Sequence, residues 1–233
     1  MKKSILPLIL LLSMVLLSSC APVYIPNAVN VPLNSNRGEL QIGGHAGSNG
    51  FDLQTSYAIT KEIAVMLNGS TMNRTDDSTN SSYHKHSFGE AAIGYYNSFD
   101  QAGRFEVFAG YGLGSSSALT TYELFSPLEV TTKGKYGRIF IQPSIGTSTK
   151  FFDGALSLRS CYVHFYDIEG NGITLTENQN GLFIEPTLTA RIGYKNVKLS
   201  TQLGVSLPVQ RDQWLDYEPF MVSVGLHVNF GKK

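Results

Sequence analysis

The stretch FMVSVGLHVNF, residues 220–230, decides the fold of this 233-residue chain. Apolar side chains stand at every second position from Phe220 to Phe230, and mostly small or polar residues stand between them. A period of two is the signature of a β-strand with one apolar face and one polar face. We therefore expect this stretch to be the closing strand of an antiparallel sheet.

The same alternation recurs from Gly38 onward, and no window offers a convincing helical period. Further stripes of this kind begin at Leu40, Phe51, Ile63, Gly89, Phe105, Ile139, Leu156, Leu182 and Val197. The spacing predicts an all-β fold, an antiparallel up-and-down transmembrane β-barrel of about ten strands, with eight as the alternative. We place this barrel at residues 38–231.

The connections between the stripes alternate in length. Long polar loops are expected near 73–82, 118–134, 167–181 and 208–217, and short turns near 60–62, 100–103, 150–154 and 195–196. Outer-membrane barrels have short turns on the periplasmic side and longer loops outside. The sequence therefore predicts that the long loops face outward and that Lys195-Asn196 faces the periplasm.

The two faces of the stripes differ in charge. The apolar stripes contain no Asp, Glu, Arg or Lys, and charged residues make up 15% of the chain, whereas a soluble surface carries about a quarter to a third. We expect the apolar face to meet lipid and the polar face to fill the lumen; a soluble lipocalin-like barrel is the alternative. The predicted lumen charge network is Glu39, Asp52, Glu90, Glu106, Glu185, Arg104, Arg138, Arg159, Arg191 and Lys198.

Aromatic residues are expected at the membrane interfaces, where amphipathic rings are favoured. One group lies near the short turns: Phe99, Phe105, Phe151, Phe152, Tyr194 and Phe230. The other lies further along the strands: Tyr57, Tyr95, Tyr96, Tyr111, Tyr136 and Tyr162.

The start of the chain has the form of a lipoprotein signal peptide, assigned to residues 1–19. Lys2 and Lys3 precede an apolar run that ends in Leu17-Ser18-Ser19-Cys20, and this run is too short to span a bilayer as a helix. Cleavage would leave Cys20 as the lipidated residue. The proline-containing residues 20–37 are expected to form a lipidated extended tether, with the N-terminus on the periplasmic side of the outer membrane.

The chain resembles the small outer-membrane β-barrel lipoproteins common in Bacteroidota. The residues that carry the resemblance are Cys20-Ala21-Pro22-Val23-Tyr24, Gly38-Glu39-Leu40-Gln41, Glu90-Ala91-Ala92-Ile93-Gly94-Tyr95-Tyr96 and the closing strand from Val224 to Phe230. The resemblance implies an outer-membrane barrel whose last strand is read by the barrel insertion machinery. Such proteins mostly have no assigned activity.

Two short patterns carry potential chemistry. His84 and His86 lie two residues apart behind Asp76-Asp77, which is a candidate rim site for a transition metal or for acid–base catalysis on lipid or peptide. Asp167 and Glu169 begin a calcium-loop-like pattern, but it lacks the bidentate Glu at its end. A polar loop end and a Gly-Asn turn are the simpler interpretations of these two patterns, so no metal, cofactor or enzymatic activity is expected.

Two loops hold apolar residues that would contact a surface ligand or fold over the barrel mouth. These are Tyr122, Leu124, Phe125 and Leu128 within 118–134, and Trp214, Leu215 and Tyr217 within 208–217. A formal net charge of zero argues against a nucleic-acid partner. The expected role is structural or surface-interacting; the alternatives are a barrel that binds a ligand in its lumen or at its rim and an outer-membrane enzyme.

Overall fold

A computed structural model describes residues 22–76, 82–123, 127–171, 173–174, 179–209 and 217–231. The predicted signal peptide and Cys20 lie outside these residues. The described chain is all-β, as expected from the alternating stripes. Its strands are β1 (Leu40–Gly47), β2 (Gly50–Ala58), β3 (Ile63–Asp76), β4 (Ser82–Phe99), β5 (Gly103–Glu123), β6 (Pro127–Ser148), β7 (Phe152–Gly170), β8 (Ile173–Thr174), β9 (Gln179–Tyr194), β10 (Val197–Val205), β11 (Leu207–Pro208) and β12 (Phe220–Phe230).

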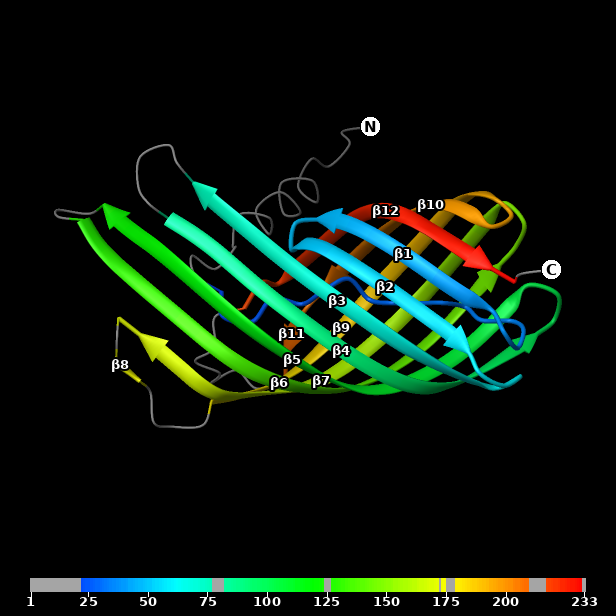
Figure 1. Ribbon diagram of the computed structural model, residues 1–233, viewed down its shortest axis with the longest axis horizontal. Coiled ribbons are helices and arrows are strands. Elements are labelled where there is room, and N and C mark those ends of the chain that lie inside the picture. The colour runs from blue at the N-terminus through cyan, green and yellow to red at the C-terminus, as the bar shows by residue number, and fades with distance from the viewer. Residues whose placement is uncertain are drawn as a thin grey trace, which may run out of the picture.

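The strands close into an antiparallel barrel (Figure 1). Sequential strands pair from β1 to β7, β9 pairs with both β7 and β10, and β12 joins β10 to β1. The two-residue strands β8 and β11 only extend the pairing of their neighbours. The closed wall therefore has ten strands, which confirms the predicted strand number and excludes eight.

The short turns lie where the sequence predicts them. β2 and β3 are joined at 59–62, β4 and β5 at 100–102, β6 and β7 at 149–151, and β9 and β10 at Lys195-Asn196. Phe230 pairs with Leu40 at the same end, so β1 begins and β12 ends beside these turns. We call this end of the barrel the short-turn end and the opposite end the long-loop end.

In three of the four predicted long loops, the described residues are mostly strand, so the predicted extent of these loops was wrong. β5 continues to Glu123 and β6 starts at Pro127, so most of 118–134 is a paired hairpin; β3 and β7 also extend into their predicted loops. The stripes fade there because outward positions such as Thr131 and Lys133 on β6 become polar, so the period of two no longer separates an apolar face from a polar one. Regular backbone pairing continues without it.

The wall of the barrel is consequently uneven in height. β5 has 21 residues and β1 has 8, whereas a strand crosses a bilayer in about 9–11 residues. Strands β3 to β7 form a tall side that extends beyond the rest at the long-loop end, and β12, β1 and β2 form a low side (Figure 1).

Apolar side chains cover the outside of the barrel. Leu67, Ile139 and Leu199 are 59–65% exposed on the outer face, while neighbours one residue away point inward and are buried. All six aromatic residues predicted near the short turns are exposed on this face. Tyr96 and Tyr136 were wrongly predicted to lie at the interface: both point inward, Tyr136 next to a register shift between β6 and β7.

Apolar-out and polar-in is the reverse of a lipocalin-like barrel, so the soluble alternative does not describe this wall. Among the described residues, no helix has the length and hydropathy needed to cross a membrane.

Candidate functional site in the barrel lumen

The interior of the barrel holds a stretch of the chain's own backbone. Residues 22–34, which we call the lumen segment, are buried throughout and run lengthwise between the walls (Figure 1, dark blue). The expected tether at 20–37 was therefore wrong for its described part, because this stretch is packed inside the wall. Its lack of charge and its run of small apolar and Asn residues suit a polar, enclosed lumen.

The direction of the lumen segment is fixed by contacts at its two ends. Tyr24 forms a bridge with Tyr217 and accepts a backbone hydrogen bond from Glu218, just before β12. Asn49, in the turn between β1 and β2, donates to the carbonyl of Pro26 at 2.7 Å. These partners lie at the long-loop end, so the described chain enters the barrel there.

The segment leaves at the short-turn end. Asn34 is bonded to Gln41 at 3.0 Å and to Ser56 at 3.2 Å, near the start of β1 and the end of β2. The carboxylate of Glu39 then accepts the backbone N–H groups of Ser35 at 2.8 Å and Asn36 at 3.0 Å. This turn, with Gly38 at a φ of 82°, reverses the chain into β1.

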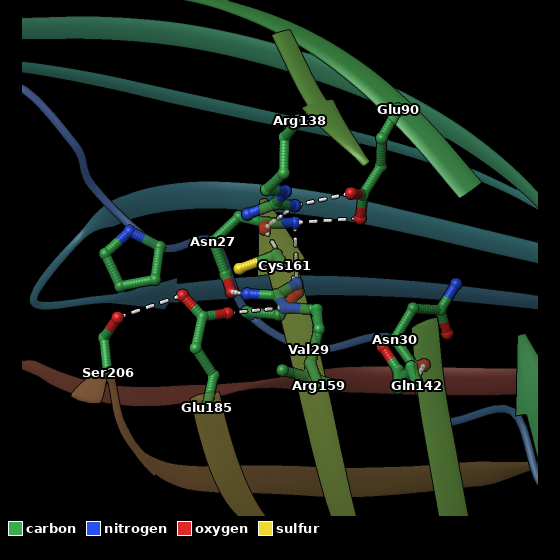
Figure 2. Close-up of polar contacts among 12 residues, drawn as sticks. Asn27, Val29, Asn30, Glu90, Arg138, Gln142, Arg159, Cys161, Glu185 and Ser206 are labelled. Carbon is green, nitrogen blue, oxygen red and sulfur yellow. Dashed lines mark hydrogen bonds and ion pairs between the residues drawn. The ribbon is translucent and has the colours of Figure 1, made fainter. Parts of the chain in front are cut away.

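Two of the predicted lumen charges form an ion pair inside the barrel (Figure 2). Arg138 on β6 contacts Glu90 on β4 at 2.5 Å, with both side chains buried. The guanidinium also donates to the Asn27 side chain at 2.6 Å and to the Tyr24 hydroxyl at 3.0 Å. Its flat face lies over the Phe88 ring, 4.2 Å from the centroid. The pair is thus tied directly to the lumen segment.

Gly112 makes the Arg138–Glu90 contact geometrically possible. Glu90 and Arg138 are on alternate strands, and both are in register with Gly112 on β5 between them. A Cβ at position 112 would stand 2.4 Å from the Phe88 ring and 2.8 Å from the Glu90 Cβ. Glycine here leaves a gap in the inner face, through which the arginine reaches across a whole strand.

A second ion pair lies beside the first. Arg159 on β7 contacts its cross-strand partner Glu185 on β9 at 2.6 Å. The two terminal nitrogens of the Arg159 guanidinium donate to the side-chain oxygen and to the backbone carbonyl of Asn27, both at 3.0 Å. Glu185 also accepts hydrogen bonds from the hydroxyls of Tyr24 at 2.8 Å and Ser206 at 3.1 Å. Asn27 therefore joins the two ion pairs, as Figure 2 shows.

The other predicted charges mostly bind backbone groups. The Glu106 carboxylate accepts the Leu33 N–H at 2.9 Å, and Arg191 donates to the Val31 carbonyl at 2.7 Å. Asp52 accepts the Ala28 N–H at 3.3 Å. Since the lumen segment forms no strand ladder, these side chains satisfy donors and acceptors that would otherwise be buried without partners.

Glu39 turns the chain into β1, Arg104 donates to the carbonyl of Gly103 at 2.8 Å, and Lys198 pairs with Asp153 at 2.5 Å. All ten predicted lumen charges are buried on the inner face.

Three residues of this site were missed in the sequence. Asp153 stands in the same alternating phase of β7 as Arg159, so the strand pattern could have placed it in the lumen. Tyr24 and Asn27 carried no such signal, because they precede the first stripe. The lumen also holds an apolar cluster, with Val29, Val31 and Leu33 among its members, that the polar stripes did not predict.

The candidate metal and catalytic residues do not come together. His84 and His86 lie on the inward face of β4, where His86 contacts the Ser70 hydroxyl at 3.1 Å. Asp167 instead accepts from Lys135 at 3.0 Å, and Glu169 lies 4.0 Å from Lys133. Both acids belong to strand β7, so the calcium-loop interpretation was wrong: these residues lie in a regular strand and not in a loop.

Among the described residues, no group of three or more His, Cys, Asp or Glu side chains is placed to hold a metal. Asp77, Leu124, Phe125, Trp214 and Leu215 lie outside the described residues, so a cluster that involves any of them lies outside as well.

Comparisons with known proteins give little beyond the architecture. No family model matches the chain, and no curated protein matches it. Among solved structures, the chain is similar to the translocator domain of the autotransporter NalP from Neisseria meningitidis. The TM-score is 0.47 at 11% sequence identity, and the match covers 82% of this chain and 86% of that one.

Proposed function

We propose that this chain is a bacterial outer-membrane lipoprotein barrel, acylated at Cys20, with a structural or surface-interacting role and a lumen closed to solutes. The apolar outer face supports a membrane location, because exposed Ile, Leu and Val side chains on every strand would be costly in water. We assign it no catalytic role and no cofactor.

One observation carries the proposal of a closed lumen: the lumen segment occupies the barrel axis and is bonded to the wall on all sides. Val29 exchanges two hydrogen bonds with Gln202 on β10, at 3.0 and 2.7 Å, and Gln142 on β6 donates to the carbonyl of Asn30 at 2.8 Å. Barrels of about eight strands are filled by side chains, and open channels appear at about 16. A ten-strand barrel has room for one extended segment, and here that segment is in place.

Planar-bilayer recording tests this proposal directly. The purified full-length protein is expected to give no steady conductance, whereas a variant lacking residues 23–34 should open a pore through the vacated axis. A matched control, Leu199→Ala on the lipid-facing side of β10, should stay silent. Folding of each variant is checked by its heat-dependent mobility on a gel. A large, steady conductance from the full-length protein would make solute passage the leading function.

A further inference from the structure

We infer that the acylated N-terminus of the mature protein is displayed on the outer surface of the cell, with its acyl chains in the outer leaflet. This inference rests on the proposed function, because it takes the short turns as periplasmic and Cys20 as lipidated. It reverses the expected periplasmic position of the N-terminus.

The first argument is the direction of the lumen segment. Tyr24 lies at the long-loop end and Asn34 at the short-turn end, so the chain enters from the side that carries the long loops. Cys20 is four positions before Tyr24, and an extended chain spans at most about 3.3–3.6 Å per position, or about 14 Å in all. The hydrocarbon core is about 30 Å thick, so Cys20 cannot reach the inner leaflet.

The second argument is the closed wall. Every neighbouring pair of long strands is hydrogen-bonded, from β1 through β7 and from β9 through β10 and β12 back to β1. The chain therefore has no lateral exit between strands. Val23 lies inside the tall side, where its side chain would be 2.7 Å from a Cβ at Gly134.

The contact between Val23 and Gly134 lies beyond the lipid-facing band, toward the long-loop end. Gly134 is in register with Ser116 and His86, next to Lys133 and Lys135, which are exposed and paired with acids on β7. On β5 and β6, the nearest exposed aliphatic residues toward the short-turn end are Leu113 and Ile139. Val23 thus lies at the level of these charged side chains, beyond the apolar band on the side of the long-loop end.

The chain before Val23 is too short to carry Cys20 away from this end of the barrel. Pro26 is bonded to Asn49 in the β1–β2 turn, and Val23 lies against Gly134 on the tall side. Cys20 is three positions before Val23, a reach of at most about 10 Å when extended. The acyl chains are therefore expected in the leaflet at the long-loop end, which fixes the barrel to the membrane from outside.

Epitope tags in intact cells test the inference. One tag is inserted between Ala21 and Pro22, a second in the loop 208–217, and a third between Lys195 and Asn196. Antibody binding is expected at the first two tags in intact cells, and at the third only after the outer membrane is permeabilised. Binding to the 208–217 tag but not to the 21/22 tag in intact cells overturns the inference and leaves the barrel proposal standing.

Exposure of the 195/196 tag in intact cells would instead overturn the proposed orientation itself, and with it the proposed function. A second variant guards against a tag that disturbs the lumen segment. The pair Val23→Cys and Gly134→Cys uses a close approach, because the Val23 side chain stands 2.7 Å from a Cβ at position 134, and a disulfide between them would hold the segment in the lumen. The 21/22 tag should remain accessible in this cross-linked protein; its loss from the surface on cross-linking contradicts the inference.

Discussion

At the scale of single residues, the lumen depends on charges that satisfy one another and the backbone. Arg138 is fully buried, and its pairing with Glu90 is supported by Asn27, Tyr24 and the gap at Gly112. Removing one partner of a buried pair leaves the other charge without compensation, which costs much more than the pair contributes when intact. The pair is therefore better viewed as a requirement of this lumen than as a source of extra stability.

Arg138→Ala is expected to lower the free energy of unfolding by about 3–5 kcal/mol, because Glu90 would remain buried and charged. Urea unfolding in detergent micelles, followed by circular dichroism, measures the change. The matched control is Lys135→Ala on the same strand, whose partner Asp167 is exposed to water, and an exposed pair contributes at most about 1 kcal/mol. Replacing Arg138 and Glu90 together by Met and Leu should cost clearly less than Arg138→Ala; equal losses would contradict the pairing argument.

At the scale of elements, the lumen segment is a stretch of chain inside the barrel that does not pair with the wall through a strand ladder. Its backbone groups are satisfied by side chains from most of the wall: Asp52, Gln54, Glu106, Gln142, Arg191 and Gln202. A barrel wall has no spare backbone donors or acceptors on its inner face, since all are used between strands. Long polar side chains are then the means of holding a segment along the axis.

Gln202→Ala removes both hydrogen bonds to Val29 and leaves a buried N–H and a buried carbonyl without partners. An unsatisfied buried polar group costs about 1–3 kcal/mol, so the free energy of unfolding should fall by at least about that amount. Leu203→Val, the next residue along β10 with its side chain on the outer face, serves as the control and should have little effect. If both substitutions have the same small effect on the urea midpoint, the segment is not held in the lumen as described.

The elements also show which parts of the structure a sequence pattern can predict. The alternation of Phe220–Phe230 and its counterparts marks strands that have an apolar outer face and a polar inner face, and these were predicted well. The extensions of β5 and β6 beyond the band carry polar residues at outward positions, such as Thr131 and Lys133, and lose the pattern. The lumen segment is enclosed on all sides, so it has no period at all, and only its lack of charge distinguishes it from a linker.

The candidate site was predictable to the same extent and for the same reason. The ten lumen charges follow from the phase of their strands, but their partners do not, because alternation says nothing of which strands face each other across the axis. Only Arg138–Glu90 and Arg159–Glu185 pair within the predicted set. Tyr24 and Asn27, which connect those pairs, come from the part of the chain that was assigned to a tether.

At the scale of the whole molecule, the outer face divides into an apolar band and a charged region above it. On β6 the outward side chains run from Ile145 through Ile141 and Ile139 to Lys135, and Lys135 lies opposite Ser115 on β5. If lipid surrounds the band, the cost of an added charge must depend on its height. A barrel standing in water would show no such dependence, so height-dependence distinguishes the two environments.

Ile141→Arg places a charge near the middle of the band, where Ile141 is 51% exposed, and should lower the free energy of unfolding in lipid vesicles by about 2–4 kcal/mol. Ser115→Arg places the same side chain at the border beside Lys135, where the expected cost is about 0–1 kcal/mol. Both positions face outward, and neither contacts the lumen segment, so the difference between the two variants reports the surroundings rather than the interior. Repeating the measurement in detergent micelles and in vesicles of thicker bilayers checks that the cost follows the membrane. Similar small costs at Ile141 and Ser115 would place the apolar face outside a bilayer and remove the main support for the membrane location.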